Sequence, residues 1–194
     1  MVQTLRLNLA TILTLARIAA IPVVVVCFYW PDPQARPIAG IIFGIAAVTD
    51  LLDGYIARNF GQISRFGTFL DPVADKLMVS IVLVLLVQGD PDWYVDLVAM
   101  LIIGREITVS ALREWMATVG AHGAVKVSWG GKLKTTLQMF GIAFMIYREQ
   151  LFGVDLYHTG FMLLLAAVGM TLWSMFIYLR AALPTMHTRD QEEG

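Results

Sequence analysis

Charged residues are scarce in this sequence. They make up 15% of the 194 residues, whereas hydrophobic residues make up 58%, and the mean hydropathy is +0.70. A soluble domain of this length carries far more charge on its surface. The shortage of charge therefore excludes an ordinary soluble domain, and we expect no nucleic-acid partner for this chain.

Cysteine is almost absent, and histidine is rare. Cys27 is the only cysteine, which excludes an intrachain disulfide and a cysteine-based zinc site. The three histidines have no carboxylate or second histidine at ligand spacing, so we expect loop or interface roles for them. A secretory signal peptide is not indicated either, because the apolar run from Leu9 to Trp30 is too long and no small-residue cleavage pattern follows it.

Long apolar segments dominate the sequence. Segments of about 20 residues recur, and each is long enough to cross roughly 30 Å of hydrocarbon. They predict an all-α, polytopic membrane protein with six transmembrane helices, at about 8–28, 37–58, 66–87, 93–119, 125–147 and 156–183. Pro184 is expected to end the sixth helix. We predict one integral membrane domain over residues 1–184 and a short polar cytosolic tail over residues 185–194.

The placement of lysine and arginine predicts the orientation of these spans. Most of these residues fall at one set of span ends, and the other set carries only Arg36 and Arg148. Because loops rich in Lys and Arg stay in the cytosol, both termini are predicted to be cytosolic. Interfacial aromatic residues lie at the opposite ends, as this orientation requires: Trp30, Trp93, Tyr94 and Tyr147.

Four aspartates interrupt the apolar pattern on either side of the connection between the second and third predicted spans. Asp50 and Asp53 are three apart, Asp71 and Asp75 are four apart, and each pair shares a helix face. The short turn between the two spans makes them neighbours and allows the two faces to converge. Four carboxylates in one pocket repel each other unless cations neutralise them, and oxygen-only ligands suit Mg²⁺ or Mn²⁺. Four are enough for two ions, which can clamp the attacking and leaving oxygens of a phosphoryl displacement.

Small residues clear space beside these aspartates. Gly54 and Ala57 lie one helical turn beyond Asp50 and Asp53, and Gly67 lies one turn before Asp71. Arg58 adds a planar cation suited to phosphate. Two other interpretations stay open. One is a set of buried polar residues that bridge helices. The other is a divalent-cation transporter, which the clustering of the acids at one membrane face disfavours.

The first span carries a polar stripe in its cytosolic half. Asn8, Thr11, Thr14 and Arg17 recur every three residues. Arg17 lies about 14 Å into the helix and must face phosphate, an acid or water. Hydrogen bonds from Thr11 and Thr14 to their own helix carbonyls are the alternative for the threonines. A purely structural ion pair is the alternative for Arg17.

A basic patch is predicted beside the acids. Arg105 and Arg113 are eight apart in the fourth span and lie within roughly 80° of each other on the helix, while Lys132 and Lys134 begin the fifth span. Arg105 needs an interior partner, and we expect a polar cavity shared with the aspartates, because adjacent helical residues such as Glu106 do not face each other well. Such a patch suits an acceptor that carries its own phosphate. Alternatively, the two lysines follow the positive-inside bias or contact anionic headgroups.

The aspartate segment resembles a known family pattern. It matches D-x2-D-G-x2-A-R-x8-G-x3-D-x3-D, the signature of the CDP-alcohol phosphotransferase family, at every fixed position. The resemblance implies the fold of that family, with six membrane helices, usually in a homodimer, and a cytosol-facing site for two divalent ions. It assigns Asp50, Asp53 and Asp71 as metal ligands and Asp75 as a ligand or catalytic base. It also places a group of residues around the nucleotide: Thr14, Arg17, Gly54, Ala57, Arg58, Ser64 and Gly67.

Three further blocks resemble one branch of this family, the bacterial phosphatidylglycerophosphate synthases. They are R-E-x5-L-R-E-W-M from Arg105, V-S-W-x-G-K-x-K-T-T-x-Q-M from Val127 and T-L-W-S-M from Thr171. The resemblance implies CDP-diacylglycerol as donor and sn-glycerol 3-phosphate as acceptor, in a bacterial cytoplasmic (inner) membrane. Its acceptor phosphate is expected at Arg105, Arg113, Lys132 and Lys134. Other acceptors of the family, namely inositol phosphate, phosphatidylglycerol and serine, stay open, although serine has no phosphate for the patch.

Overall fold

The computed structural model describes residues 9–60, 65–118 and 129–190. These residues form six α-helices and one short β-hairpin. The helices are α1 (Leu9–Tyr29), α2 (Ala35–Phe60), α3 (Arg65–Gly89), α4 (Trp93–Thr118), α5 (Trp129–Tyr147) and α6 (Leu156–Asp190). Each corresponds to one predicted segment, so the prediction of an all-α fold with six helices is confirmed. Residues 125–128, the predicted start of the fifth helix, lie outside the described residues.

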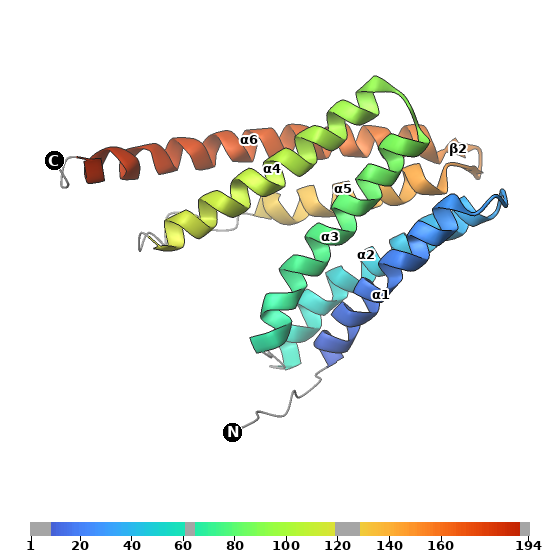
Figure 1. Cartoon of the computed structure of the whole chain (residues 1–194), viewed down its shortest axis with the longest axis horizontal. Helices are drawn as coiled ribbons and strands as arrows, with labels where there is room; N and C mark the ends of the chain where they lie inside the picture. Colours follow the sequence, from blue (N-terminus) through green and yellow to red (C-terminus); the bar gives the residue numbers. More distant parts are fainter. Residues whose placement is uncertain (1–8, 61–64, 119–128, 191–194) are drawn as a thin grey trace.

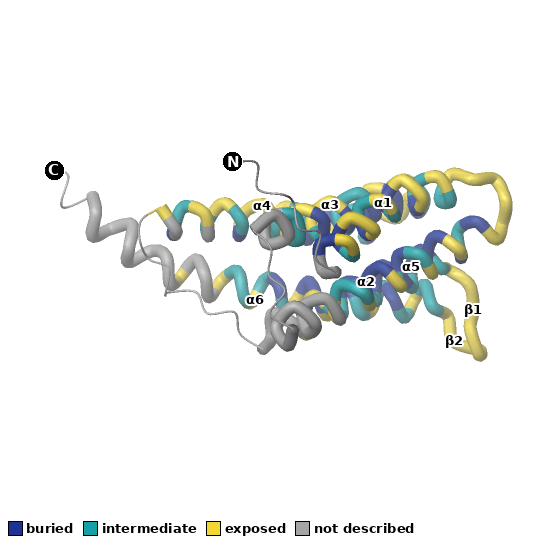
Figure 2. Tube along the Cα trace, turned by 90° about the horizontal axis from the view of Figure 1, so that it is seen from below, coloured by how far each residue is buried: buried dark blue, intermediate teal, exposed yellow. Residues whose placement is uncertain are grey.

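The helices form two layers. Figure 2 shows α1, α3 and α4 in one layer and α2, α5 and α6 in the other. Contacts join the layers, since α1 packs against α2, α3 against α5, and α4 against α6. The core lies between the layers, and its fully buried side chains include Phe43, Met78, Leu86, Ile146 and Leu164. Each helix therefore buries one stripe of apolar side chains and leaves another facing outward.

Successive helices run in alternating directions. The α1–α2 turn, the α3–α4 turn and the β-hairpin lie at one side of the molecule, and the start of α1 and the end of α6 lie toward the other side (Figure 1). At that other side α1, α2 and α3 extend away from α4 and α6. This arrangement agrees with the alternating spans that the sequence predicts.

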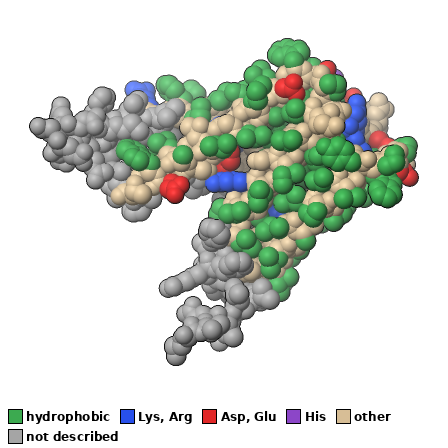
Figure 3. All heavy atoms as spheres, in the orientation of Figure 1, with side chains coloured by type: hydrophobic (Ala, Val, Ile, Leu, Met, Phe, Trp, Pro, Cys, Tyr) green, Lys and Arg blue, Asp and Glu red, His purple; other side chains and the backbone are tan. Residues whose placement is uncertain are grey.

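The outward faces of the helices are strongly apolar. Large hydrophobic side chains are exposed on most helices, for example Ile45 at 62%, Met100 at 63% and Trp173 at 68%. In Figure 3 hydrophobic side chains are spread over the visible surface, and charged ones occupy small separate spots. By length and composition, two helices in the described residues qualify as membrane spans, over Thr11–Tyr29 and Leu156–Phe176. That all six helices cross the membrane stays a prediction.

Two local details differ from the sequence prediction. The expected end of the sixth helix at Pro184 is wrong, because α6 continues to Asp190. Proline removes one backbone hydrogen bond from a helix, and a helix of 35 residues keeps most of its other hydrogen bonds. Pro22 and Pro72 also lie inside helices, α1 and α3. The division into residues 1–184 and a tail stays a prediction.

A β-hairpin connects α5 to α6, where the sequence analysis left a gap between two predicted helices. Strand β1 (Gln150–Leu151) pairs antiparallel with β2 (Val154–Asp155). Phe152 and Gly153, the two residues between the strands, have φ angles of 53° and 79°. Two consecutive positive φ angles are what a tight two-residue hairpin turn requires. The hairpin thus joins α5 to α6 within a few residues.

Candidate functional site

Arg17 connects the two aspartate segments. Its side chain is 2% exposed, and its Nη1 lies 2.8 Å from Asp50 Oδ1 and 2.5 Å from Asp75 Oδ1. Asp50 belongs to α2 and Asp75 to α3, and α1 packs against both helices. Because one nitrogen contacts both carboxylates, the two acids lie close together. The expected convergence of the second and third helices is therefore observed at Asp50 and Asp75.

Thr14 extends this cluster to a third aspartate. It lies three residues before Arg17 on α1, is buried, and donates a hydrogen bond from Oγ1 to Asp71 Oδ1. The polar stripe of the first helix therefore faces the acids, as its spacing of three predicts. The sequence left phosphate, an acid or water as partners for Arg17, or a purely structural ion pair, and the structure provides two acids. We call Arg17, Asp50, Asp71, Asp75 and Thr14 the acidic cluster.

The chemistry of the acidic cluster fits a hard divalent cation. Among the described side chains, three carboxylates of the cluster surround one cation, Arg17, and carboxylate oxygens are the ligand atoms that Mg²⁺ and Mn²⁺ prefer. Within the described part of the chain, however, no group of three or more Asp, Glu, His or Cys side chains is arranged to hold a metal ion. The side chain of Asp53 is outside that part. The predicted pair of ions therefore stays a prediction.

Several other predicted site residues, or their side chains, lie outside the described part of the structure. Ser64 lies outside the described residues. For six more, only the position along a helix is described and the side chain is not: Gly54, Ala57 and Arg58 in α2, Gly67 in α3, Arg113 in α4 and Lys132 in α5. Their predicted contacts with nucleotide or acceptor stay predictions.

Arg105 pairs with Glu106, a local partner that the sequence analysis considered but disfavoured. Its side chain is 8% exposed, and Nη1 lies 2.9 Å from Glu106 Oε2. The two adjacent residues pair although their positions on the helix do not face each other well, because both side chains are long enough to bend toward each other. Arg105 Nε is buried and has no hydrogen-bond acceptor among the described residues. Lys134, the other predicted basic residue with a described side chain, is buried as well.

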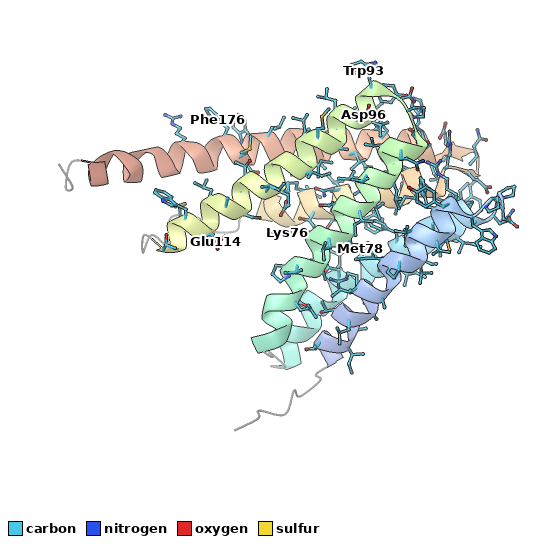
Figure 4. The ribbon with its side chains drawn as sticks, in the orientation of Figure 1. Lys76, Met78, Trp93, Asp96, Glu114 and Phe176 are labelled. Carbon is cyan, nitrogen blue, oxygen red and sulfur yellow. The ribbon has the colours of Figure 1, made fainter. Side chains whose placement is uncertain are left out.

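Lys76, which the sequence prediction left out, lies next to the acidic cluster along α3. It follows Asp75 on α3, and its Nζ donates a hydrogen bond of 2.6 Å to Ser110 Oγ on α4 (Figure 4). Ser110 Oγ in turn donates to the backbone carbonyl of Glu106 at 2.7 Å. These contacts link the acidic cluster on α3 to the Arg105 region of α4. The signal was available, since Lys76 is the one cation in the apolar segment 66–87.

A second buried ion cluster lies at the opposite end of α3. Asp90 follows α3 directly, and its side chain is 2% exposed. Its Oδ2 lies 2.6 Å from Arg36 Nη2 of α2, and its Oδ1 lies 2.9 Å from Arg148 Nη1, just after α5. The guanidinium of Arg36 also lies over the ring of Phe28 at 4.9 Å. These residues, here called the Asp90 cluster, join the ends of three helices.

Known proteins resemble this chain over nearly its whole length. The family model described as CDP-alcohol phosphatidyltransferase matches residues 7–177. A protein of Salmonella choleraesuis (strain SC-B67), named CDP-diacylglycerol–glycerol-3-phosphate 3-phosphatidyltransferase, is 47% identical over 178 residues, which are 92% of this chain and 96% of that protein. A protein of Escherichia coli (strain K12) with the same name is 46% identical with the same coverage. The chain belongs to the CDP-alcohol phosphatidyltransferase family.

Proposed function

We propose that this protein transfers the phosphatidyl group of CDP-diacylglycerol to the 1-hydroxyl of sn-glycerol 3-phosphate, which gives phosphatidylglycerophosphate and CMP. Relatives named for this activity are 46–47% identical to the chain and cover 92% of it. The observation that carries the proposal is the acidic cluster, in which Arg17 draws Asp50 and Asp75 together from two different helices. Three aspartates of the family pattern contact a single polar stripe on α1.

The reaction is a single displacement at phosphorus. The 1-hydroxyl oxygen of the acceptor bonds to the β-phosphorus of CDP-diacylglycerol, the bond from that phosphorus to the bridging oxygen breaks, and CMP leaves with that oxygen. Asp50, Asp53, Asp71 and Asp75 are the residues that would hold Mg²⁺ or Mn²⁺, two ions in all, and the ions supply positive charge beside the pyrophosphate. No side chain acts as a nucleophile in this step, because the acceptor hydroxyl attacks the phosphorus directly.

Asp75 is the base that takes the proton of the attacking hydroxyl. Its side chain is 35% exposed, compared with 20% for Asp50, so an acceptor reaches it more easily. Arg17 holds one oxygen of this carboxylate and thereby fixes its orientation. The other oxygen is left to receive the proton. Arg17 and Thr14 act here by positioning Asp75 and Asp71, and Arg17 also offers charge to the nucleotide phosphates.

The acceptor phosphate binds at the basic residues of α4 and α5. Arg105 supports this assignment because it keeps a buried Nε without an acceptor among the described residues. Arg113, Lys132 and Lys134 complete the site, with Gly54, Ala57, Arg58, Ser64 and Gly67 around the nucleotide. The hydrogen bonds from Lys76 through Ser110 to α4 keep this region close to Asp75. The acceptor's hydroxyl and phosphate are thereby held by different helices.

The cellular setting follows from the same proposal. The protein crosses the bacterial cytoplasmic membrane six times, with both termini and the acidic cluster on the cytosolic side, and forms a homodimer. The exposed apolar side chains of the described helices support contact with lipid. Alternating helix directions support an arrangement with both termini on one side.

Release of CMP tests the proposed function. The purified protein in detergent should release CMP from CDP-diacylglycerol when sn-glycerol 3-phosphate is present, and not with serine, inositol phosphate or phosphatidylglycerol. Release with one of the other alcohols would reassign the acceptor. The transporter interpretation makes a different prediction, namely metal flux into vesicles that contain no CDP-linked lipid. Flux without CMP release would overturn the proposal.

A further inference from the structure

Thr171 is a buried polar residue of α6, outside the acidic cluster. It is 2% exposed, and its Oγ1 has no hydrogen-bond partner among the described residues. A threonine or serine inside a helix can bond a carbonyl of its own helix, and Ser174 does so by donating to the Thr171 carbonyl at 2.8 Å. A buried hydroxyl without a partner is destabilising, and its usual partner in such cases is a group that the chain itself does not supply.

The packing of α5 against α6 places Thr171 opposite Lys134. The two helices are antiparallel and touch closely at Gly141, where an added Cβ atom would lie 2.9 Å from Leu164 Cγ. Lys134 precedes Gly141 by seven residues, and Thr171 follows Leu164 by seven. Seven residues are nearly two full turns, so both residues stay on the faces that meet, roughly 10 Å from this contact and in the same direction. Both are buried there.

The packing of α4 against α6 brings Arg105 to the same level. The two helices lie in different layers and contact each other, and the ring centroids of Tyr94 and Phe161 are 5.0 Å apart (Figures 1 and 2). Arg105 and Leu172 each lie eleven residues further along, which is about three turns on helices that run in the same direction. Thr171 directly precedes Leu172, so Arg105 lies at the level of Thr171.

Three helices thus contribute buried polar side chains at one level of the fold. They are Arg105 of α4, Lys134 of α5 and Thr171 of α6. Two are cations, and the third is a neutral hydroxyl that adds a hydrogen-bond donor without adding charge. Arg105 Nε and Thr171 Oγ1 both have no partner among the described residues. This combination suits a phosphate, whose oxygens accept hydrogen bonds from guanidinium, ammonium and hydroxyl groups.

We propose that the Thr171 hydroxyl donates a hydrogen bond to the phosphate of sn-glycerol 3-phosphate. The inference rests on the proposed function, in which that phosphate binds at Arg105 and Lys134. It extends the acceptor site from α4 and α5 to α6. The two cations attract a phosphate in any orientation, whereas the hydroxyl of a buried threonine binds one oxygen from one direction. That contact helps to orient the acceptor so that its 1-hydroxyl reaches Asp75.

The substitutions Thr171→Val and Thr171→Ser test this contact as a pair. Valine keeps the shape of the side chain and removes the hydroxyl, so the KM for sn-glycerol 3-phosphate should rise about tenfold, while the KM for CDP-diacylglycerol stays unchanged. Serine keeps the hydroxyl and loses a buried methyl group, so it should recover most of the acceptor affinity and lower the unfolding temperature. If Thr171 only packs, valine should leave the acceptor KM unchanged, which would overturn the proposal.

Inorganic phosphate distinguishes the phosphate of the acceptor from its glycerol part. Used as a competitive inhibitor against sn-glycerol 3-phosphate, it should show an inhibition constant that rises in the Thr171→Val protein by the same factor as the acceptor KM. An unchanged inhibition constant beside a raised KM would place the hydroxyl against the glycerol part and overturn the phosphate contact. Equal rises in the KM values of both substrates would indicate a general distortion and would also overturn it.

Thr159→Val is the matched control. Thr159 lies in the first turn of the same helix, and its hydroxyl donates a hydrogen bond of 2.7 Å to the Asp155 carbonyl. The substitution should leave both KM values and the inhibition constant as they are. An increase in the acceptor KM equal to that of Thr171→Val would overturn the proposal. Failure of the unaltered protein to release CMP with sn-glycerol 3-phosphate would instead overturn the proposed function, so the two failures are distinguishable.

Discussion

The acidic cluster and the Asp90 cluster both contain ion pairs between arginine and aspartate, but the ratio of arginine to aspartate in these pairs is reversed. In the first, one buried arginine lies between two aspartates, and in the second, one buried aspartate lies between two arginines. The first keeps an excess of negative charge, and Asp75 in it is about a third exposed. The second has an excess of positive charge, and its arginines also lie over the aromatic rings of Phe28 and Tyr157.

The difference indicates which cluster is available for chemistry. Surplus carboxylate oxygens attract a further cation and leave an acceptor for a proton. A carboxylate enclosed by two guanidinium groups has no such capacity, so the Asp90 cluster joins helix ends. A buried ion pair is costly to break from one side because the remaining charge is left unpaired. Substitutions in the acidic cluster should therefore mainly reduce activity, and substitutions in the Asp90 cluster should mainly reduce stability.

Removal of divalent metal should have the largest effect. A chelator should reduce CMP release to background, and Mg²⁺ or Mn²⁺ should restore it, because the carboxylates of the acidic cluster lack their counter-cations. The unfolding temperature should change little, since Arg17 still pairs with Asp50 and Asp75. Full turnover in the chelated protein would contradict the metal assignment.

Asp75→Asn should reduce CMP release by about a thousandfold, because the amide cannot accept the proton of the attacking hydroxyl. Steady-state turnover with both substrates saturating measures it. The matched control is Asp92→Asn, an exposed carboxylate in the α3–α4 turn, which should keep wild-type turnover. Turnover of the Asp75 variant within tenfold of wild type would remove Asp75 from the role of base.

Asp90→Asn should act on stability and leave the chemistry intact. Two guanidinium groups lose their buried carboxylate, which we expect to cost about 3 kcal/mol. Thermal unfolding in detergent should show an unfolding temperature lower by about 6 °C or more for a chain of this size. Turnover per folded molecule should match wild type. A stable variant with impaired turnover would show that the Asp90 cluster contributes to catalysis. The two clusters would then not differ in function as argued above.

Arg148→Gln should have the smallest effect. The Arg148 side chain is 53% exposed, and pairs of this kind contribute less than about 1 kcal/mol. Arg36→Gln should cost more in the same unfolding measurement, because Arg36 is 18% exposed and lies closer to Asp90. Equal losses for the two arginines would show that exposure does not govern this cluster.

Much of the fold could be predicted from apolar segment length and breaker residues. The predicted bounds of the second, third and fourth helices lie within two residues of α2, α3 and α4. The end of α6 could not be predicted, because proline ends a helix only where the lost hydrogen bond is not outweighed by the rest of the helix. The hairpin left only a weak signal, the pair Phe152–Gly153, since its strands are two residues each.

The site could be predicted as a set of residue types but not as a set of contacts. Helical spacing placed Thr14 and Arg17 on one face and the aspartates on two others. Helical spacing could not show that Arg17 forms ion pairs with both Asp50 and Asp75, because that depends on how α1 packs against α2 and α3. The Arg105–Glu106 pair was disfavoured at first because helical geometry constrains Cβ directions and not the ends of long side chains.

The position of Arg17 has a consequence for how the protein is made. Its helix is one of the two in the described chain that qualify as membrane spans, yet the carboxylate of Asp75 that pairs with Arg17 lies 58 residues later. During synthesis the guanidinium emerges well before α3, so α1 cannot reach its final surroundings until α3 has emerged. The three N-terminal helices should therefore assemble as one unit, and a cut between α1 and α3 should be far harder to tolerate than a cut between α3 and α4.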